Sequence, residues 1–234
     1  MAIKSYAYND NTQLSAHFNV QEFKCKCGNP HSILISEETV KQLEALYNEL
    51  VKRYGDDIII TINSGYRCYA HDKAVGGSGT GQHTKGTAVD IRCKQKGAVV
   101  TSKLICCIAQ DLGFSGIANI NAGYTDTHLD TRTGSKWYGD ETKGNGTVTA
   151  DFYEYFGIVR EPPGNVPRGT IRKGDKGDNV LWLQARLFDF GYLTKPDIDG
   201  IFGIKTQRAL VCFQFENGLT VDGICGDKTK EKLK

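Results

Sequence analysis

The hydrophobic positions of the N-terminal half predict a long amphipathic helix followed by a buried strand. After Ser36, apolar residues recur at spacings of three and four as far as Leu50, which predicts a helix that is capped by Ser36 and ends before Gly55. Ile58–Ile62 is a short β-branched run that stops at a turn sequence. Such a run is typical of a buried strand, and the residues after it are expected near a sheet edge.

Two further strands and a second helix are expected after a glycine-rich loop. The strands are expected at about residues 87–93 and 125–131, and the helix at about residues 97–112. This mixture indicates an α+β domain with a small mixed or antiparallel sheet and flanking helices.

The C-terminal part of the chain contains an internal repeat. Asp199–Thr206 recurs as Asp222–Thr229, and each copy opens with an Asp-Gly turn that leads towards a helix start. Apolar residues between the copies recur at helical spacing, so a small all-α bundle of three helices is expected. Proline and glycine concentrate just before this region, as they do in linkers. The predicted organisation is a first domain at 1–157, a linker at 158–169 and a helical domain at 170–234.

Composition excludes some classes of function. Hydrophobic residues make up 39% of the chain and charged residues 24%, which is ordinary for a globular protein with a packed core. A formal net charge of +2 without a basic stripe argues against a nucleic-acid partner. The N-terminus lacks the apolar core of a secretory signal, and no run of about 20 apolar residues is present. We therefore expect synthesis in the cytoplasm and no membrane insertion.

Eight cysteines are many for a chain of this length. Cys106 and Cys107 lie in an apolar, helix-like run and are interpreted as small core residues. Cys25 and Cys27, followed by His31, could bind a metal ion. A structural zinc usually takes four ligands with wider spacing between paired cysteines, so packing or a disulfide is the favoured interpretation.

A histidine and several carboxylates have a spacing that suits a catalytic metal. His83 lies in a loop and Asp90 on the strand that follows, so their side chains can converge. A third ligand is available downstream, because strand alternation puts Asp126, His128 and Asp130 on one face. Two histidines, one carboxylate and an open position for water describe a hydrolytic zinc centre. Spacing alone leaves open that these are ordinary core or surface residues.

Several short motifs between Leu14 and Arg132 occur together in this order: Leu14–Phe18, Glu22–Gly28, Ser64–Arg67, Val75–Gly77, His83–Asp90 and His128–Arg132. In order and spacing they resemble the M15 zinc peptidases, a family that includes D-alanyl-D-alanine carboxypeptidases and the L-alanyl-D-glutamate endopeptidases of phage lysins. The resemblance implies one catalytic Zn²⁺ held by His83, Asp90 and His128.

The resemblance also implies roles for other residues of the site. Arg67 matches an arginine that holds a substrate carbonyl or carboxylate and stabilises the charge that develops there. The family usually has an acidic residue three positions before the last ligand, but this chain has Thr125 there. We therefore favour Asp126 as the general base. Asp130 is a same-face alternative that could instead orient a ligand.

The C-terminal part resembles a peptidoglycan-binding helical module. The matching segments are Gly174–Asp178, Leu183–Gln184, Gly191–Tyr192, Asp199–Gly203, Phe213–Gln214 and Val221–Gly223. Most of these residues are expected to build the bundle, so no ligand contacts are predicted. Bacterial peptidoglycan is the partner that this resemblance implies.

Together the two resemblances imply a monomeric, endolysin-like peptidoglycan hydrolase that cleaves a peptide bond next to a D-amino acid with zinc-activated water. It would act at the cell wall after release through a holin-like membrane lesion. Two alternatives remain open. One is a D,D-carboxypeptidase that trims terminal D-alanine, and the other is a non-catalytic wall-binding or signalling protein in which zinc only stabilises the fold.

Overall fold

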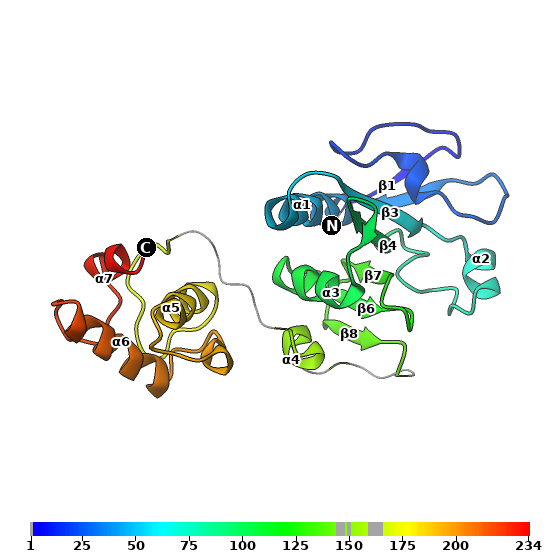
Figure 1. Ribbon diagram of the computed structural model, residues 1–234. Coiled ribbons are helices and arrows are strands. Elements are labelled where there is room, and N and C mark those ends of the chain that lie inside the picture. Colours follow the sequence, from blue (N-terminus) through cyan, green and yellow to red (C-terminus); the bar gives the residue numbers. More distant parts are fainter. Residues whose placement is uncertain (1, 144–147, 149–150, 159–165) are drawn as a thin grey trace. The chain divides into compact units, whose positions relative to one another are not determined.

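The chain divides into two compact units, Met1–Phe156 and Gly157–Lys234. The computed structural model in Figure 1 describes residues 2–143, 148, 151–158 and 166–234. Most of the predicted linker, residues 159–165, lies outside the described residues. The predicted domain bounds stay predictions, and each unit is described by itself below.

The first unit is built on a six-stranded sheet in the order β3-β4-β7-β6-β8, with β5 paired to β4. The β6–β8 pair is parallel and the other pairs are antiparallel, so the sheet is mixed as predicted. The strands span β3 (Ile58–Ser64), β4 (Ala88–Gln95), β5 (Ala98–Val99), β6 (Gly116–Asn119), β7 (Thr127–Asp130) and β8 (Trp137–Asp140). A separate two-stranded sheet pairs β1 (Ile3–Tyr6) with β2 (Ile33–Ser36).

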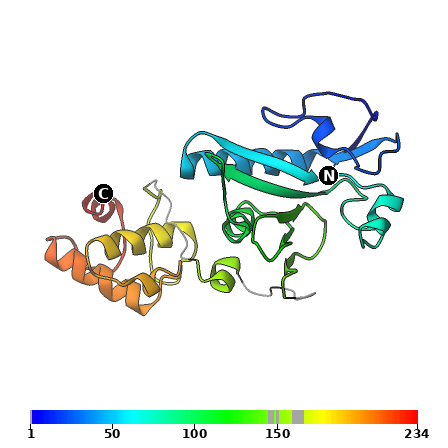
Figure 2. The same cartoon turned by 45° about the vertical axis from the view of Figure 1, so that its right-hand side comes forward.

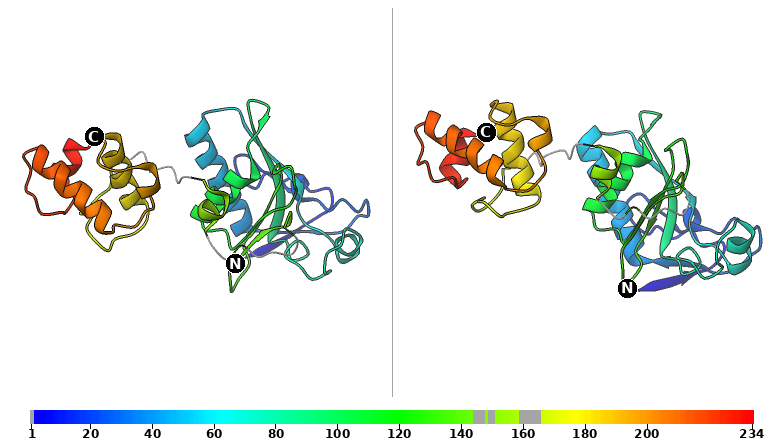
Figure 3. Two further views of the ribbon diagram at one scale, coloured as in Figure 1. Left: turned by 60° about the horizontal axis from the view of Figure 1, so that its bottom comes forward. Right: turned by 90° about the horizontal axis from the view of Figure 1, so that it is seen from below.

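Three helices lie along one face of the large sheet (Figures 1 and 3). They are α1 (Glu37–Tyr54), α3 (Ser102–Asp111) and α4 (Phe152–Phe156). Two short helices lie in connecting segments: the 3-10 helix η1 (Val20–Phe23) between β1 and β2, and α2 (Tyr69–Ala74) between β3 and β4. Helix α1 begins as predicted, because the Ser36 side chain accepts a hydrogen bond from the Thr39 backbone N–H at 3.4 Å. Cys106 and Cys107 are fully buried in α3, which confirms their interpretation as core residues.

The second helix is shorter than its predicted span of 97–112. Gln95 pairs with Ala98 across a two-residue turn, and both turn residues, Lys96 and Gly97, have positive φ angles of 49° and 80°. A turn with two positive φ angles closes a tight hairpin, so residues 98–99 continue as a strand. Helix α3 therefore starts only at Ser102.

Strand alternation divides the sheet into a helix-covered face and an open face. On β7, the Thr127 hydroxyl donates to Ser102 of α3 at 3.0 Å, so Thr127 points towards the helices. On β8, Asp140 likewise points towards α4, where Tyr155 donates to its carboxylate at 3.0 Å. Because neighbouring residues alternate, His128 and Trp137 point to the opposite, open face. Their rings contact edge to face at 5.9 Å.

The second unit contains the predicted three helices, α5 (Asp178–Asp189), α6 (Ile204–Glu216) and α7 (Asp227–Lys232), which run from yellow to red in Figure 2. Its core includes Trp182, Leu183, Phe202 and Phe213. This confirms the all-α assignment for the C-terminal part.

A buried glutamine holds each copy of the sequence repeat. Gln184 donates to Asp199 at 2.8 Å and accepts from the Gly200 N–H at 2.8 Å. Gln214 makes the same pair of bonds, at 2.9 Å each, to Asp222 and Gly223. These repeated residues therefore satisfy the buried polar groups of two equivalent turns.

Among the described residues, no helix is long and apolar enough to span a membrane.

Candidate metal centre

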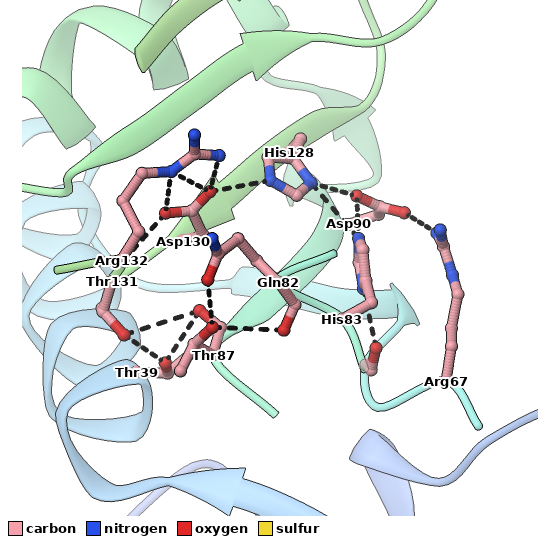
Figure 4. A network of polar contacts seen from close by, with 11 residues as sticks. Thr39, Arg67, Gln82, His83, Thr87, Asp90, His128, Asp130, Thr131 and Arg132 are labelled. Atoms are coloured by element: carbon pink, nitrogen blue, oxygen red, sulfur yellow. Dashed lines mark hydrogen bonds and ion pairs between the residues drawn. The ribbon is translucent and has the colours of Figure 1, made fainter. Parts of the chain in front are cut away.

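The three predicted zinc ligands converge on the open face of the sheet. Asp90 on β4 and His128 on β7 are direct partners in the antiparallel register, and His83 comes from the loop between α2 and β4. Asp90 Oδ1 lies 3.2 Å from His83 Nε2 and 2.9 Å from His128 Nδ1. The two imidazole nitrogens are 3.3 Å apart. All three residues are little exposed and their ligating atoms form one cluster (Figure 4).

The donor set and its spacing fit a divalent cation such as Zn²⁺. Tetrahedral ligands at about 2.0–2.1 Å from zinc would be about 3.3 Å apart, close to the separations observed here. The outer nitrogen of each ring has its own partner: His83 Nδ1 donates to the Gly65 carbonyl at 2.7 Å, and His128 Nε2 donates to Asp130 at 3.2 Å. These bonds fix the tautomers and direct the remaining lone pairs into the cluster, as in protein zinc sites.

The loop that carries His83 is held by local contacts. The Thr87 hydroxyl donates to the Gln82 side chain at 2.9 Å, next to His83. Gly86 has a φ of +73°, and a Cβ there would lie 2.4 Å from the Leu34 carbonyl oxygen. The glycine in this motif, Gly86, is therefore required by the fold rather than by the chemistry. In addition, the Thr39 hydroxyl of α1 bonds to Thr131 at 2.8 Å, which links the helix to the end of β7.

The electrostatics of the cluster favour positive charge. Burial opposes ionisation of Asp90, but the adjoining His128 and His83 hold its pKa well below the usual range. Burial would lower the pKa of His128, but Asp130 and Asp90 outweigh it and raise this pKa to about 9. His128 lies between the carboxylates of Asp90 and Asp130, and a bound cation would balance the negative charge of these two groups.

Arg67 lies beside this cluster. Its Nε donates to the Ser64 hydroxyl at 2.8 Å and its Nη2 donates to Asp90 Oδ2, the carboxylate oxygen that faces away from His128. The third nitrogen, Nη1, is 3.5 Å from Asp72, a long and therefore weak bond. Asp72 is itself buried and accepts from the Gly79 N–H at 2.8 Å. Arg67 thus orients Asp90 through Nη2, while its Nη1 is held only by the weak hydrogen bond to Asp72.

Asp130 orients His128 rather than facing solvent. Its carboxylate is fully buried, contacts His128 Nε2, and accepts from the Arg132 N–H and guanidinium (Figure 4). Burial alone would raise the pKa of Asp130, but the bonds from His128 and Arg132 lower it well below its usual range. The sequence left two roles open for Asp130, general base or orientation of a ligand, and these contacts fit the second.

Gly116 on β6 makes room for the Asp130 carboxylate, since a Cβ at this position would lie 2.0 Å from Asp130 Oδ2. We expect Gly116→Ala to displace that carboxylate from His128 and to weaken zinc affinity about 10–100-fold. Competition with a chromophoric chelator would measure the change. Gly123→Ala is the matched control, because its Cβ would make only an ordinary contact, 3.7 Å from Thr125. Equal affinities for the two variants would contradict this role of Asp130.

Asp126 is not in the cluster, although strand alternation puts it on the same face. Its carboxylate accepts bonds from Arg92 at 2.9 and 2.6 Å, from Asn63 at 2.7 Å and from Thr125 at 2.9 Å, and also from Asn121. Burial would raise the pKa of Asp126, but Arg92 and Thr125 lower it. With its lone pairs occupied, Asp126 is better suited to hold loop and strands together than to accept a proton. Its assignment as the base stays a prediction.

Glu141 was not among the predicted site residues, yet it follows β8 on the open face. Alternation from Trp137 through Gly139 puts its side chain on the same face as His128. Gly139 and His128 both pair with Ala118 of β6, so β8 lies one strand away from β7, which carries His128. Partial loss of hydration raises the pKa of Glu141, and its carboxylate interacts electrostatically with His128, Asp90 and Arg67. The residues from Trp137 to Glu141 do not alternate between apolar and polar, so no local sequence pattern indicated Glu141.

Comparison with known families agrees with this geometry. Residues 16–130 match the model of the Peptidase M15 family, and residues 176–233 match that of the "Putative peptidoglycan binding domain". The first range contains His83, Asp90 and His128, and the second contains the three helices of the C-terminal unit.

Individual relatives match over about a quarter of the chain. The chain is 51% identical over 57 residues to the N-acetylmuramoyl-L-alanine amidase CwlM of Mycobacterium tuberculosis, covering 24% of this chain and 14% of that protein. It is 46% identical over 64 residues to the spore cortex-lytic enzyme of Oceanobacillus iheyensis, covering 27% and 23%. A solved structure of the Burkholderia AP3 phage endolysin is 42% identical over 28% of this chain and 25% of that chain, with a TM-score of 0.27.

The chain thus spans less than a quarter of the length of these two curated relatives. The family models cover most of both compact units. The fold, the three converging side chains and the family matches together lead to one assignment. This chain carries a domain of the Peptidase M15 family followed by a domain of the peptidoglycan-binding family.

Proposed function

We propose that this protein is a zinc-dependent peptidoglycan hydrolase that cleaves a peptide bond of the cell-wall stem peptide or cross-link next to a D-amino acid. The observation that carries the proposal is the convergence of His83, Asp90 and His128 inside a peptidase domain that is joined to a peptidoglycan-binding domain. The printed names of the relatives, an amidase and cortex-lytic enzymes, support the cell wall as the substrate.

His83, Asp90 and His128 would hold the metal, which when bound would supply Lewis acidity and lower the pKa of a coordinated water. Glu141 is the residue that we propose as proton acceptor for the attacking water. Its position on the open face and the upward shift of its pKa suit proton transfer better than the carboxylate of Asp126, which already accepts several hydrogen bonds.

Arg67 is proposed to stabilise the charge on the substrate carbonyl. Its weakly bonded Nη1 could turn from Asp72 to the substrate, while Nη2 keeps Asp90 in place. A preoriented guanidinium next to the reacting carbonyl costs little reorganisation, which is the condition for effective electrostatic stabilisation. The Trp137 ring contacts the His128 ring and lies against the Arg132 guanidinium, and it would form an apolar wall of the substrate site.

The direct test is incubation of purified cell walls with the protein, followed by measurement of new amino groups and mass spectrometry of the soluble fragments. An endopeptidase releases cross-linked or stem-peptide fragments, whereas a D,D-carboxypeptidase releases only free D-alanine. We expect fragments with new amino termini, and their loss on addition of a zinc chelator. Zinc-loaded protein that binds walls but releases no amino groups would instead support a non-catalytic wall-binding protein.

The C-terminal unit is proposed to hold the enzyme on its insoluble substrate. Tethering raises the local substrate concentration without adding a catalytic contact. A chain that ends at Ile158 keeps the compact first unit and should lose lysis of whole walls by at least about tenfold, but keep hydrolysis of soluble wall peptides. Turbidity of wall suspensions and peptide hydrolysis would be measured in parallel. An equal loss on both substrates would contradict the tethering role.

A further inference from the structure

A second group of metal-ligating side chains lies in the first unit, apart from the three residues described above. Cys25, Cys27, His31 and Cys68 each offer one ligand atom, and these four atoms all lie within 4.8 Å of one another. All eight cysteines of the chain are free thiols in this structure. Cys25 is buried, and Cys27 and Cys68 are partly buried.

The local geometry prepares these residues for a cation. Cys27 Sγ is 3.1 Å from His31 Nε2, while His31 Nδ1 donates to the Ser32 carbonyl at 2.9 Å. The second bond fixes the tautomer that leaves a lone pair on Nε2, the nitrogen that faces the sulfur. The ring is further fixed by edge-to-face contact with Tyr66 at 5.6 Å.

Backbone N–H groups donate to two of the sulfurs. Cys25 Sγ accepts from the Cys68 N–H at 3.4 Å, and Cys27 Sγ accepts from the Asn29 N–H at 3.4 Å. Donors of this kind stabilise the negative charge of a thiolate and position it. Gly28, with a φ of +78°, allows the tight turn between Cys27 and Asn29.

We propose that Cys25, Cys27, His31 and Cys68 bind a second, structural Zn²⁺. Three sulfurs and one imidazole nitrogen are a usual tetrahedral zinc set, and four protein ligands leave no position for water. Zn–S bonds of about 2.3 Å place sulfurs about 3.8 Å apart, so these four atoms need only small movements to close around the ion. The inference does not depend on the proposed hydrolase activity.

This ion would fasten the segment before β2 to the segment that carries Arg67. Cys68 follows Arg67 directly, and the Tyr66 N–H already donates to the Phe23 carbonyl at 2.8 Å. Gly65 packs so closely on Phe23 that a Cβ there would lie 2.6 Å from Phe23 Cα. The ion would take three ligands from the segment before β2 and the fourth, Cys68, from the segment that carries Arg67, so it would join the two segments. The second zinc therefore acts as a positioning element for the arginine next to Asp90.

The test is the zinc content of the full-length protein, purified under reducing conditions and measured by elemental analysis and native mass spectrometry. We expect two zinc ions per chain in the unaltered protein and one in Asp90→Ala. X-ray absorption of Asp90→Ala should show three sulfurs at about 2.3 Å and one nitrogen around the remaining ion. Cys68→Ser should lose the sulfur-bound ion. Cys212→Ser, an exposed cysteine of the C-terminal unit, should keep both.

The Asp90→Ala spectrum keeps the inference testable even where Cys68→Ser fails to fold, because it leaves all four proposed ligands intact. A remaining ion with only nitrogen and oxygen ligands would overturn the inference. So would a chain without sulfur-bound zinc whose intact mass is lowered by a disulfide among these cysteines. Retention of the sulfur-bound zinc alongside a failure to hydrolyse walls would separate this site from the proposed function.

Discussion

Replacing Asp90 by alanine is expected to remove zinc from the catalytic cluster and to lower wall hydrolysis by on the order of 10³-fold or more, about 4 kcal/mol of transition-state stabilisation. Asp90 is the anionic ligand that both imidazoles contact, and it is also the partner of Arg67 Nη2. Its loss leaves two neutral ligands beside a guanidinium that has lost its nearest carboxylate, and this positive charge repels a divalent cation. Zinc content and release of amino groups from walls would be measured on the same preparation.

Asp56→Ala is the matched control for this experiment, because Asp56 is an exposed carboxylate of the same unit. It should keep both zinc and rate. Normal wall hydrolysis by a metal-free Asp90→Ala protein would reject the zinc mechanism outright. Partial activity restored by added zinc would show only that affinity had been weakened.

Replacing Glu141 by glutamine is expected to lower kcat by about 10²–10⁴-fold while zinc content and KM stay close to those of the unaltered protein. Glutamine keeps the size of the side chain and removes the group that accepts a proton. Glu141 is exposed, so the change should leave folding intact. Steady-state rates on a soluble wall peptide, with zinc measured in parallel, would separate loss of the base from loss of the metal.

Asp126→Asn provides the contrast with Glu141→Gln. Asp126 accepts a bidentate bond from Arg92 and further bonds from three neighbours, so this variant should lose about 1–3 kcal/mol of stability and keep most of its kcat. Urea denaturation would measure the first effect. If Asp126→Asn loses its rate with stability intact and Glu141→Gln does not, the general base is Asp126, as the spacing near His128 first suggested.

The elements with strong periodicity were predictable from the sequence. The Ser36 cap and the apolar stripe predicted helix α1, and the β-branched run at Ile58 predicted strand β3. Alternation around His128 correctly predicted that it lies on the face opposite to Thr127. These features depend on neighbours within a few residues, which is the range over which sequence patterns are informative.

The parts that could not be predicted depend on contacts between distant segments. Strands β6 and β8 show no alternation of apolar and polar residues, and Glu141 was missed with them. The partner of Asp126 is Arg92 on a neighbouring strand, which no local pattern indicates. Cys68 is far along the chain from Cys25 and Cys27, and the narrow spacing of that pair alone argues against a metal site. Only the fold brings Cys68 close to them.

The pairing of Asp90 with His128 across neighbouring strands links folding to the supply of ions. A slip of one residue between β4 and β7 would send one of these side chains to the helix-covered face, so the pair exists only in the correct register. An ion that binds this register and not the unfolded chain adds free energy that grows with the logarithm of its free concentration. Both groups of metal-ligating residues found in the described part of the chain lie in the first unit. The melting temperature of that unit should therefore follow zinc availability, whereas that of the helical unit should not.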